Sequence, residues 1–334
     1  MQLPNPKHSF SFSLNMLNPP LSLLSDDLLL SIVEQLARLP FADTNLKNLS
    51  LADRAFTESC QKYIFRELKL RGSGIFNQLT RVKKFFYDKP SFANRVRILE
   101  LDISDNENAW LFKNPDFTSI LQLFAKSPMP PHQLHLGGPL DFIIEDPILV
   151  TRQLAESFFS QTLTILRVRE CVNFPLSLFL ICPRLREVFL DRVGTTDKSY
   201  DKYPDNHCSG REAPLLEVLE YSKSHSLVEQ MIAPPPRFNT PVVLWSNLRV
   251  LTVAPHDEKG MVCLQPILDA ACNTLEELYL TRKTVGYSRC RVSDNTKQIL
   301  IIFLTSSSPP TCWTREPQQS SKPAGIFPHH HYKL

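Results

Sequence analysis

The hydrophobic positions near the N-terminus follow the period of a helix. In LSLLSDDLLLSIVEQLARLP, residues 21–40, Ser25 is a good helix N-cap, and Asp26 and Asp27 fall in the first turn, where the helix dipole favours negative charge. On a helical wheel, the apolar residues among Leu28–Leu39 cover roughly 200°, whereas a surface helix needs only about 100°. The surplus is either buried inside the same domain or offered to another chain.

The following residues decide between these two possibilities. The segment TNLKNLSLADRAFTESCQKYIFRELKL, residues 44–70, predicts a short helix in LSLADRAF and then an aromatic-rich helix that ends near Leu70. A unit of about 50 residues with three short helices is too small to bury so many leucines alone. The pattern therefore favours a partner protein that covers the surplus apolar surface.

Beyond residue 94 a second pattern, L-x-x-L-x-L, recurs at intervals of roughly 22 to 35 residues. Helical stretches such as FTSILQLFA, LVTRQLAESFF, LVEQMIA and LQPILDAACNT separate the copies. Each unit is therefore expected to be one strand plus one helix, and stacking of the units builds a continuous core. The copies are Val96–Leu101, Pro131–Leu136 (degraded), Leu163–Cys171, Leu185–Val193, Leu216–Tyr221, Leu248–Val253 and Leu275–Leu280.

Side chains alternate in direction along a strand, so each copy has a core face and an inner, concave face. The core positions include Leu99, Leu101, Leu166 and Val168. The inner face is either a partner-binding surface or an ordinary solvated sheet face. Its residues are Glu100, Asp102, His135, Arg167, Arg169, Phe189, Asp191, Glu220, Thr252 and Tyr279.

Four residues of this inner face are the strongest candidates for contact with a protein substrate. Arginine and aromatic side chains most often anchor protein interfaces. Arg167, Arg169, Phe189 and Asp191 come from adjacent copies, so their side chains are expected to lie side by side. The alternative is that Arg169 simply forms an ion pair with Asp191.

Composition restricts the chemistry further. The net charge of +3 over 334 residues gives no reason to expect nucleic-acid binding. The eight cysteines form no CxxC pair and are typical of reduced thiols, with Cys171 expected as a buried structural thiol. His132 and His135 lack a nearby cysteine or acid, and the sequence contains no phosphate loop or hydrolase motif. We expect no catalytic residue, no cofactor and no metal.

The leucine-rich N-terminal stretch does not predict a membrane segment. Asp26 and Asp27 interrupt the apolar run, and the proline-containing start lacks a small-residue cleavage site. We therefore expect no membrane association and no secretion, and a location in the cytoplasm, the nucleus or both.

The N-terminal pattern resembles the F-box. Its opening corresponds to Leu24, Ser25, Asp27, Leu28, Leu29, Ile32 and Leu36, and its second half to Leu49, Ser50, Leu51, Arg54 and Phe56. YIFRELKL is similar to the exit of many fungal F-box proteins. Two positions depart from the family: Ser25 replaces the usual proline, and Asp53 stands where cysteine is frequent. The whole chain resembles a divergent, fungal-type F-box protein with leucine-rich repeats.

The resemblance implies an α/β fold: a short three-helix F-box followed by an irregular leucine-rich-repeat solenoid. It also implies a substrate-recognition subunit of a cullin-based ubiquitin ligase, which binds a Skp-type adaptor, through it a cullin, and an unknown protein substrate. An interaction scaffold without a role in ubiquitin transfer is the alternative. The residues implied in adaptor binding are Leu24, Leu28, Leu29, Ile32, Leu36, Leu49, Leu51 and Phe56.

These patterns divide the chain into five segments. The expected segments are a disordered start at 1–19, the F-box-like domain at 20–70, a helical linker at 71–94, the repeat solenoid at 95–304 and a disordered tail at 305–334. The solenoid is expected to end in an apolar helix at Lys297–Phe303.

Overall fold

The chain has a mixed α/β fold, which consists of two compact units that meet at Gly137 and Gly138. The computed structural model describes residues 24–71, 75–103, 109–144, 146–195, 212–234, 241–254, 263–281 and 299–303. The expected disordered segments at 1–19 and 305–334 lie outside these residues. So does most of a predicted surface insertion at 197–214.

The first unit begins with α1 (Asp26–Arg38), α2 (Ala42–Ala52), the 3₁₀ turn η2 (Arg54–Phe56) and α3 (Thr57–Ile64). Ser25 caps α1 as expected, because its Oγ accepts a hydrogen bond from the Leu28 amide at 3.4 Å. Asp53 caps η2 in the same way, with its carboxylate 2.8 Å from the Ala55 amide. The second helix is longer than predicted, since it starts at Ala42 rather than in the LSLADRAF segment.

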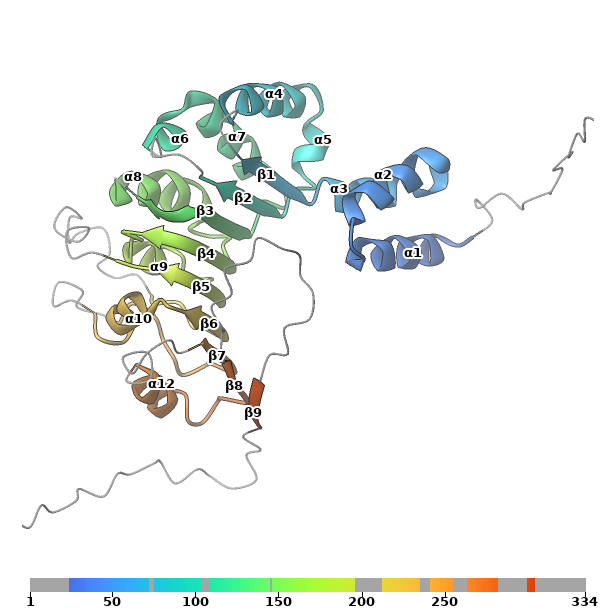
Figure 1. Ribbon diagram of the computed structural model, residues 1–334. Helices are drawn as coiled ribbons and strands as arrows, with labels where there is room; N and C mark the ends of the chain where they lie inside the picture. Colours follow the sequence, from blue (N-terminus) through green and yellow to red (C-terminus); the bar gives the residue numbers. More distant parts are fainter. Residues whose placement is uncertain are drawn as a thin grey trace, which may run out of the picture. The chain divides into compact units, whose positions relative to one another are not determined.

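Nine strands among the described residues are hydrogen-bonded in the order in which they occur in the chain (Figure 1). The strands from β1 to β3 pair in parallel, and so do those from β4 to β8, whereas β8 and β9 are antiparallel. The strands are β1 (Glu67–Arg71), β2 (Ile98–Asp102), β3 (Gln133–Ile143), β4 (Ile165–Val172), β5 (Glu187–Val193), β6 (Val218–Ser222), β7 (Val250–Ala254), β8 (Glu277–Thr281) and β9 (Ile299–Phe303).

Helices lie between most successive strands, as the sequence pattern predicts; among the described residues none lies between β5 and β6 or between β8 and β9. In the second unit, α9, α10 and α12 lie on the same side of the strands they connect (Figure 1). The connecting helices are α4 (Ile75–Asp88), α5 (Pro90–Ala93), α6 (Ala109–Lys113), α7 (Pro115–Ala125), α8 (Pro147–Val150), the π-helix η3 (Thr151–Phe159), α9 (Ser177–Ile181), α10 (His225–Ile232) and α12 (Leu264–Ala270).

The strand register explains the position of the core. Leu166, Val188, Leu219, Leu251 and Leu278 stand in one row across β4 to β8, and all five are buried. The buried helix positions, such as those of α9 and α10, complete this core. All seven L-x-x-L-x-L segments contain strands, and their leucine positions form the interior of the sheet.

The structure corrects two predicted elements. The aromatic-rich helix does not continue to Leu70, because α3 ends at Ile64 and β1 begins at Glu67, parallel to β2. The apolar helix expected at Lys297–Phe303 is instead β9, which adds to β8 as an antiparallel strand. In both segments, backbone hydrogen bonds with a neighbouring strand stabilise the extended conformation.

Candidate protein-docking surfaces

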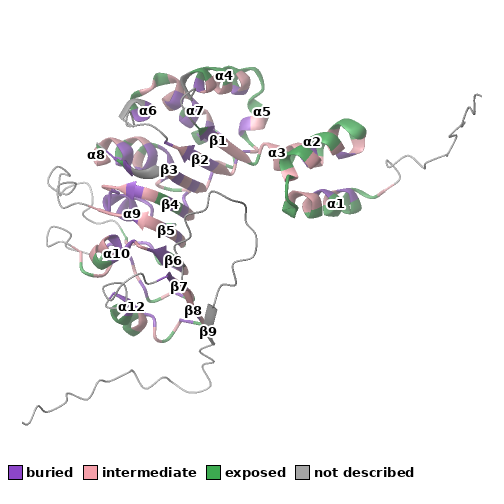
Figure 2. Cartoon of the chain, in the orientation of Figure 1, coloured by how far each residue is buried: buried purple, intermediate pink, exposed green. Residues whose placement is uncertain are grey.

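The segment from α1 to α2, with the turn between them, carries five of the nine large apolar side chains that the described residues expose. On α1, Leu28 and Ile32 are one turn apart, with 54% and 39% of their surface exposed. Phe41 and Leu51, before and within α2, reach 84% and 85%, and Leu39 is also exposed. Much of α1 and α2 is coloured as exposed in Figure 2. We call these five residues the exposed apolar set; such a concentration is typical of interaction sites.

Two of the residues assigned to adaptor binding are not on the surface. Leu29 is 4% and Phe56 is 2% exposed, and both lie in a core cluster with Val33, Leu46 and Cys60. In the free chain these two side chains hold the helices together beneath the surface, and their assignment to adaptor binding stays a prediction. Three further members of the predicted set, Leu24, Leu36 and Leu49, are half-buried against the same cluster.

The four residues predicted for substrate contact lie on two adjacent strands, β4 and β5. Arg167 is opposite Phe189, and its guanidinium carbon lies 4.1 Å from the centre of the ring, in a cation–π contact. Arg169 is opposite Asp191. The structure thus brings all four side chains together on one face.

Cys171 lies one residue before the end of β4, and its side chain is buried as the sequence predicts. Its side chain is buried, and burial raises the pKa of the thiol. A thiol with a raised pKa is a poor nucleophile. We therefore assign it to packing.

A charged network covers the corresponding face of β1, β2 and β3. The Nζ of Lys69 lies 2.8 Å from Glu67 and 3.7 Å from Glu100, and Arg71 also pairs with Glu100. The ligand atoms of Glu67, Glu100 and His135 lie within 4.8 Å of one another, a donor set suited to a divalent cation. Lys69 and Arg71 already neutralise the two carboxylates, so this network does not require a metal ion.

The two carboxylates of this network titrate differently. Burial raises the pKa of Glu67, and a hydrogen bond with Glu100 raises it further. Burial also acts on Glu100, but hydrogen bonds with Glu67 and Arg71 outweigh it and lower the pKa of Glu100. As pH falls, Glu67 therefore takes up a proton before Glu100 does.

This difference predicts opposite pH dependences for two matched variants. A raised pKa means that the folded state binds the Glu67 proton more tightly than the unfolded state, so this contribution to stability is lost as pH rises through the raised pKa. Glu67→Gln should therefore gain stability relative to the wild type as pH rises from the unfolded pKa of a glutamate through the raised pKa of Glu67, by about 1 kcal/mol or less. Urea denaturation at several pH values measures the difference.

Glu100→Gln is the matched control. The pKa of Glu100 is lowered in the folded state, so the ionised Glu100 stabilises the wild type at pH values above its unfolded pKa, and this contribution is lost as pH falls. The free energy of unfolding of Glu100→Gln should therefore fall further below that of the wild type as pH rises, which is opposite to the trend for Glu67→Gln. Trends of the same sign in the two variants would show that the proton is not held by Glu67.

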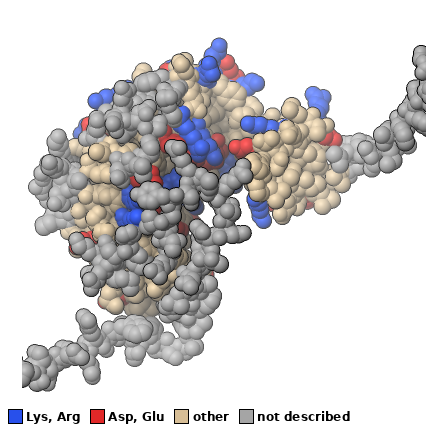
Figure 3. Space-filling model, in the orientation of Figure 1, with Lys and Arg blue, Asp and Glu red and all other residues tan. Residues whose placement is uncertain are grey.

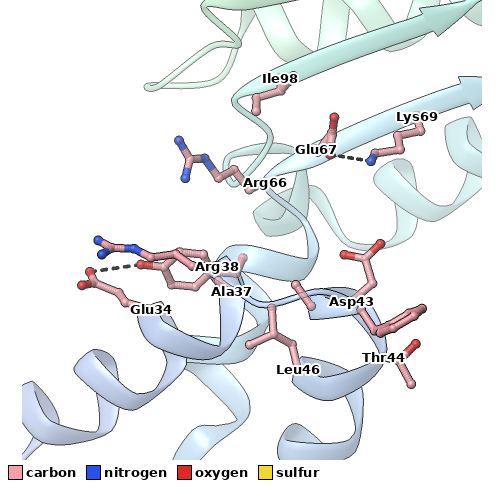
Figure 4. Close-up of a pocket in the computed structure, with 13 residues that line it drawn as sticks. Glu34, Ala37, Arg38, Asp43, Thr44, Leu46, Arg66, Glu67, Lys69 and Ile98 are labelled. Carbon is pink, nitrogen blue, oxygen red and sulfur yellow. Dashed lines mark hydrogen bonds and ion pairs between the residues drawn. The ribbon is translucent and has the colours of Figure 1, made fainter. Parts of the chain in front are cut away.

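A cavity of about 890 Å³, drawn in Figure 4, lies between the N-terminal helices and the start of the sheet. Glu34 and Arg38 of α1, Asp43 of α2 and Arg66, which precedes β1, are among its lining residues. The hydroxyl of Tyr63 donates to Glu34 at 3.1 Å, and burial together with this bond raises the pKa of Tyr63. None of the residues that line this cavity was predicted as a site residue from the sequence.

No family model matches the chain, and a search of curated proteins found none that resembles it. Among the described residues, the helices are all too short or too polar to cross a membrane.

Proposed function

We propose that the chain is the substrate-recognition subunit of a cullin-based ubiquitin ligase. In this proposal α1 and α2 bind a Skp-type adaptor, and the face of β4 and β5 binds a protein substrate. The chain performs no chemistry; it raises the concentration of the substrate near a ubiquitin-loaded enzyme.

The observation that carries the proposal is the exposed apolar set on a small helical segment. Its core is a cluster of only five buried residues, yet Leu28, Ile32, Leu39, Phe41 and Leu51 remain exposed. Leucine and phenylalanine side chains that are exposed in the free chain and become buried against a partner provide the largest contribution to the free energy of association. The order of the strands supports the second part of the proposal, which is substrate binding. Strands that pair in chain order provide an extended face on which a protein substrate can lie.

A reconstituted ubiquitylation assay tests the proposal. The full chain is mixed with adaptor, cullin, RING protein, conjugating enzyme and ubiquitin, and transfer to the chain itself is measured by gel shift. We expect transfer that requires both the adaptor and the exposed apolar set. Adaptor binding without any transfer would indicate the scaffold alternative instead.

The strand face provides a separate prediction about substrate choice. Reversing both charges in Arg167→Glu/Arg169→Glu should remove most proteins captured in proximity labelling, because interface arginines often contribute about 2 kcal/mol or more each. The melting temperature should fall only slightly, since the lost Arg167–Phe189 contact is worth about 0.5–1 kcal/mol. Adaptor binding should be unchanged.

The matched control reverses two exposed arginines outside this face, Arg152 on η3 and Arg184 before β5. It changes the net charge equally and should leave the labelled proteins unchanged. If Arg167→Glu/Arg169→Glu also leaves them unchanged, substrates are bound elsewhere.

A further inference from the structure

In the second unit, β4, β5 and β6 present a row of side chains along which the charge changes sign. Arg167 of β4 is opposite Phe189 of β5, which in turn is opposite Glu220 of β6. The two charged side chains are exposed, and the aromatic ring between them is half-buried. We call these three residues the charge-crossing row. Figure 3 shows acidic and basic side chains beside one another on the visible face of the molecule.

The residues beside this row give the same distribution of charge. Arg169 adds a second exposed basic side chain to β4. Glu187 and Asp191 lie on the same side of β5 as Phe189, because side chains alternate in direction along a strand. On this face β4 is therefore basic, whereas β5 and β6 are acidic.

Contacts within the chain leave the charges at both ends of the row available to a partner. The guanidinium carbon of Arg167 lies 4.1 Å from the centre of the Phe189 ring, a contact that positions the group without neutralising its charge. In the part of the chain that the structure describes, neither Arg167 nor Glu220 belongs to an ion pair.

Strained backbone marks the same three strands directly beside this face. Glu170, Arg192 and Lys223 have φ values of 56°, 56° and 51°. The residues that precede them are opposite one another in the strand register, so the three occupy equivalent positions on β4, β5 and β6. Left-handed backbone is unfavourable for residues other than glycine, and it clusters at binding and active sites. The strain therefore supports a binding role for these strands.

The spacing of the strands indicates which kind of segment fits the row. Neighbouring strands are about 4.8 Å apart, so β4 and β6 are separated by about 9.6 Å. In a polyproline II segment, residues three positions apart lie on the same side and are separated by about 9.3 Å. In a β-strand, residues two or four positions apart share a side at about 7 Å or about 13 Å, and neither distance matches.

We propose that the charge-crossing row binds a polyproline II segment of the substrate with an acidic and a basic residue three positions apart. The acidic residue contacts Arg167, whose guanidinium group binds a carboxylate in a bidentate manner. The basic residue contacts Glu220, and the two residues between them pack against Phe189, since aromatic side chains commonly bind polyproline II segments. This inference rests on the proposed function, because it names the class of substrate segment that the strand face takes.

Fluorescence anisotropy with the full chain, at low salt and without adaptor, tests the row. The probe is a labelled peptide that contains Glu-Pro-Pro-Lys, which its prolines hold near the polyproline II conformation. The comparison peptides contain Glu-Pro-Pro-Glu, Lys-Pro-Pro-Lys or, with adjacent charges, Pro-Glu-Lys-Pro. The wild type should bind Glu-Pro-Pro-Lys about tenfold more tightly than each of the others, because each of those loses one charge-assisted contact.

Charge reversal at either end of the row should exchange these preferences. Glu220→Lys makes both ends basic and should bind Glu-Pro-Pro-Glu about tenfold more tightly than Glu-Pro-Pro-Lys. Arg167→Glu/Arg169→Glu makes β4 acidic and should prefer Lys-Pro-Pro-Lys. A variant that has only lost its structure binds every peptide less tightly, so an exchanged preference separates recognition from folding.

Glu229→Lys on α10 is the matched control, because it reverses the charge of another exposed glutamate in the same unit. It should keep the wild-type order of affinities. The inference is overturned if the wild type binds none of the peptides or does not distinguish Glu-Pro-Pro-Lys from the peptide with adjacent charges. It is also overturned if neither charge reversal exchanges the preference, or if Glu229→Lys exchanges it as well. Because no adaptor is present, these results are independent of adaptor-dependent ubiquitin transfer, so the failure of either proposal can be recognised separately.

Discussion

Leu28→Ala/Ile32→Ala is expected to weaken binding to a Skp-type adaptor by at least a hundredfold. Both side chains are exposed and one helical turn apart on α1. Burial of each against a partner contributes about 1.5–3 kcal/mol, so loss of the pair amounts to about 3 kcal/mol or more, which is over a hundredfold in Kd. Isothermal titration calorimetry with purified adaptor measures the change.

The same substitutions should hardly affect folding, because side chains that are already in water contribute little to the core. Tyr87→Ala/Met129→Ala removes two equally exposed apolar side chains from elsewhere in the first unit and should not affect the adaptor. Equal affinities of the Leu28→Ala/Ile32→Ala variant and the wild type would exclude α1 as the binding element.

Phe56→Ala is expected to cost about 3–5 kcal/mol in the free energy of unfolding of the N-terminal helices. The ring is almost fully buried in the cluster with Leu29 and Val33, and its removal leaves a cavity in a very small core. We expect amides of α1, α2 and α3 to exchange rapidly with deuterium while β4 to β8 stay protected. Adaptor binding should be lost together with the structure of the helices.

Leu51→Ala controls for a general effect of truncation near Phe56. Leu51 is on α2 but is exposed to solvent, so its loss should change stability by less than about 0.5 kcal/mol. If Phe56→Ala leaves amide exchange in the helices at the wild-type rate, the cluster does not stabilise them.

The repeated strands could be predicted from the sequence because a strand has a period of two. In a segment such as LREVFLDRV, buried leucine and valine alternate with polar or aromatic residues. This alternation also identified Leu166 and Val168 as core residues, which the structure confirms. The face that Arg167 and Phe189 share follows from the same alternation.

Three features could not be predicted because they depend on neighbours distant in the sequence. RELKL, at β1, directly follows a helix, and its strand conformation is stabilised by pairing with β2. ILIIF, at β9, is a short apolar run that suits a helix or a strand equally. A helical wheel cannot divide a 200° apolar arc between an inner side with Leu29 and an outer side with Leu28.

The proposed function depends most on the binding of a Skp-type adaptor by the exposed apolar set. Hydrogen–deuterium exchange of the full chain with and without the purified adaptor measures this binding at the helices themselves. We expect the adaptor to slow exchange in α1 and α2, around Leu28, Ile32 and Leu51, and to leave β4 to β8 unchanged. No protection anywhere, or protection confined to the strands, would contradict it.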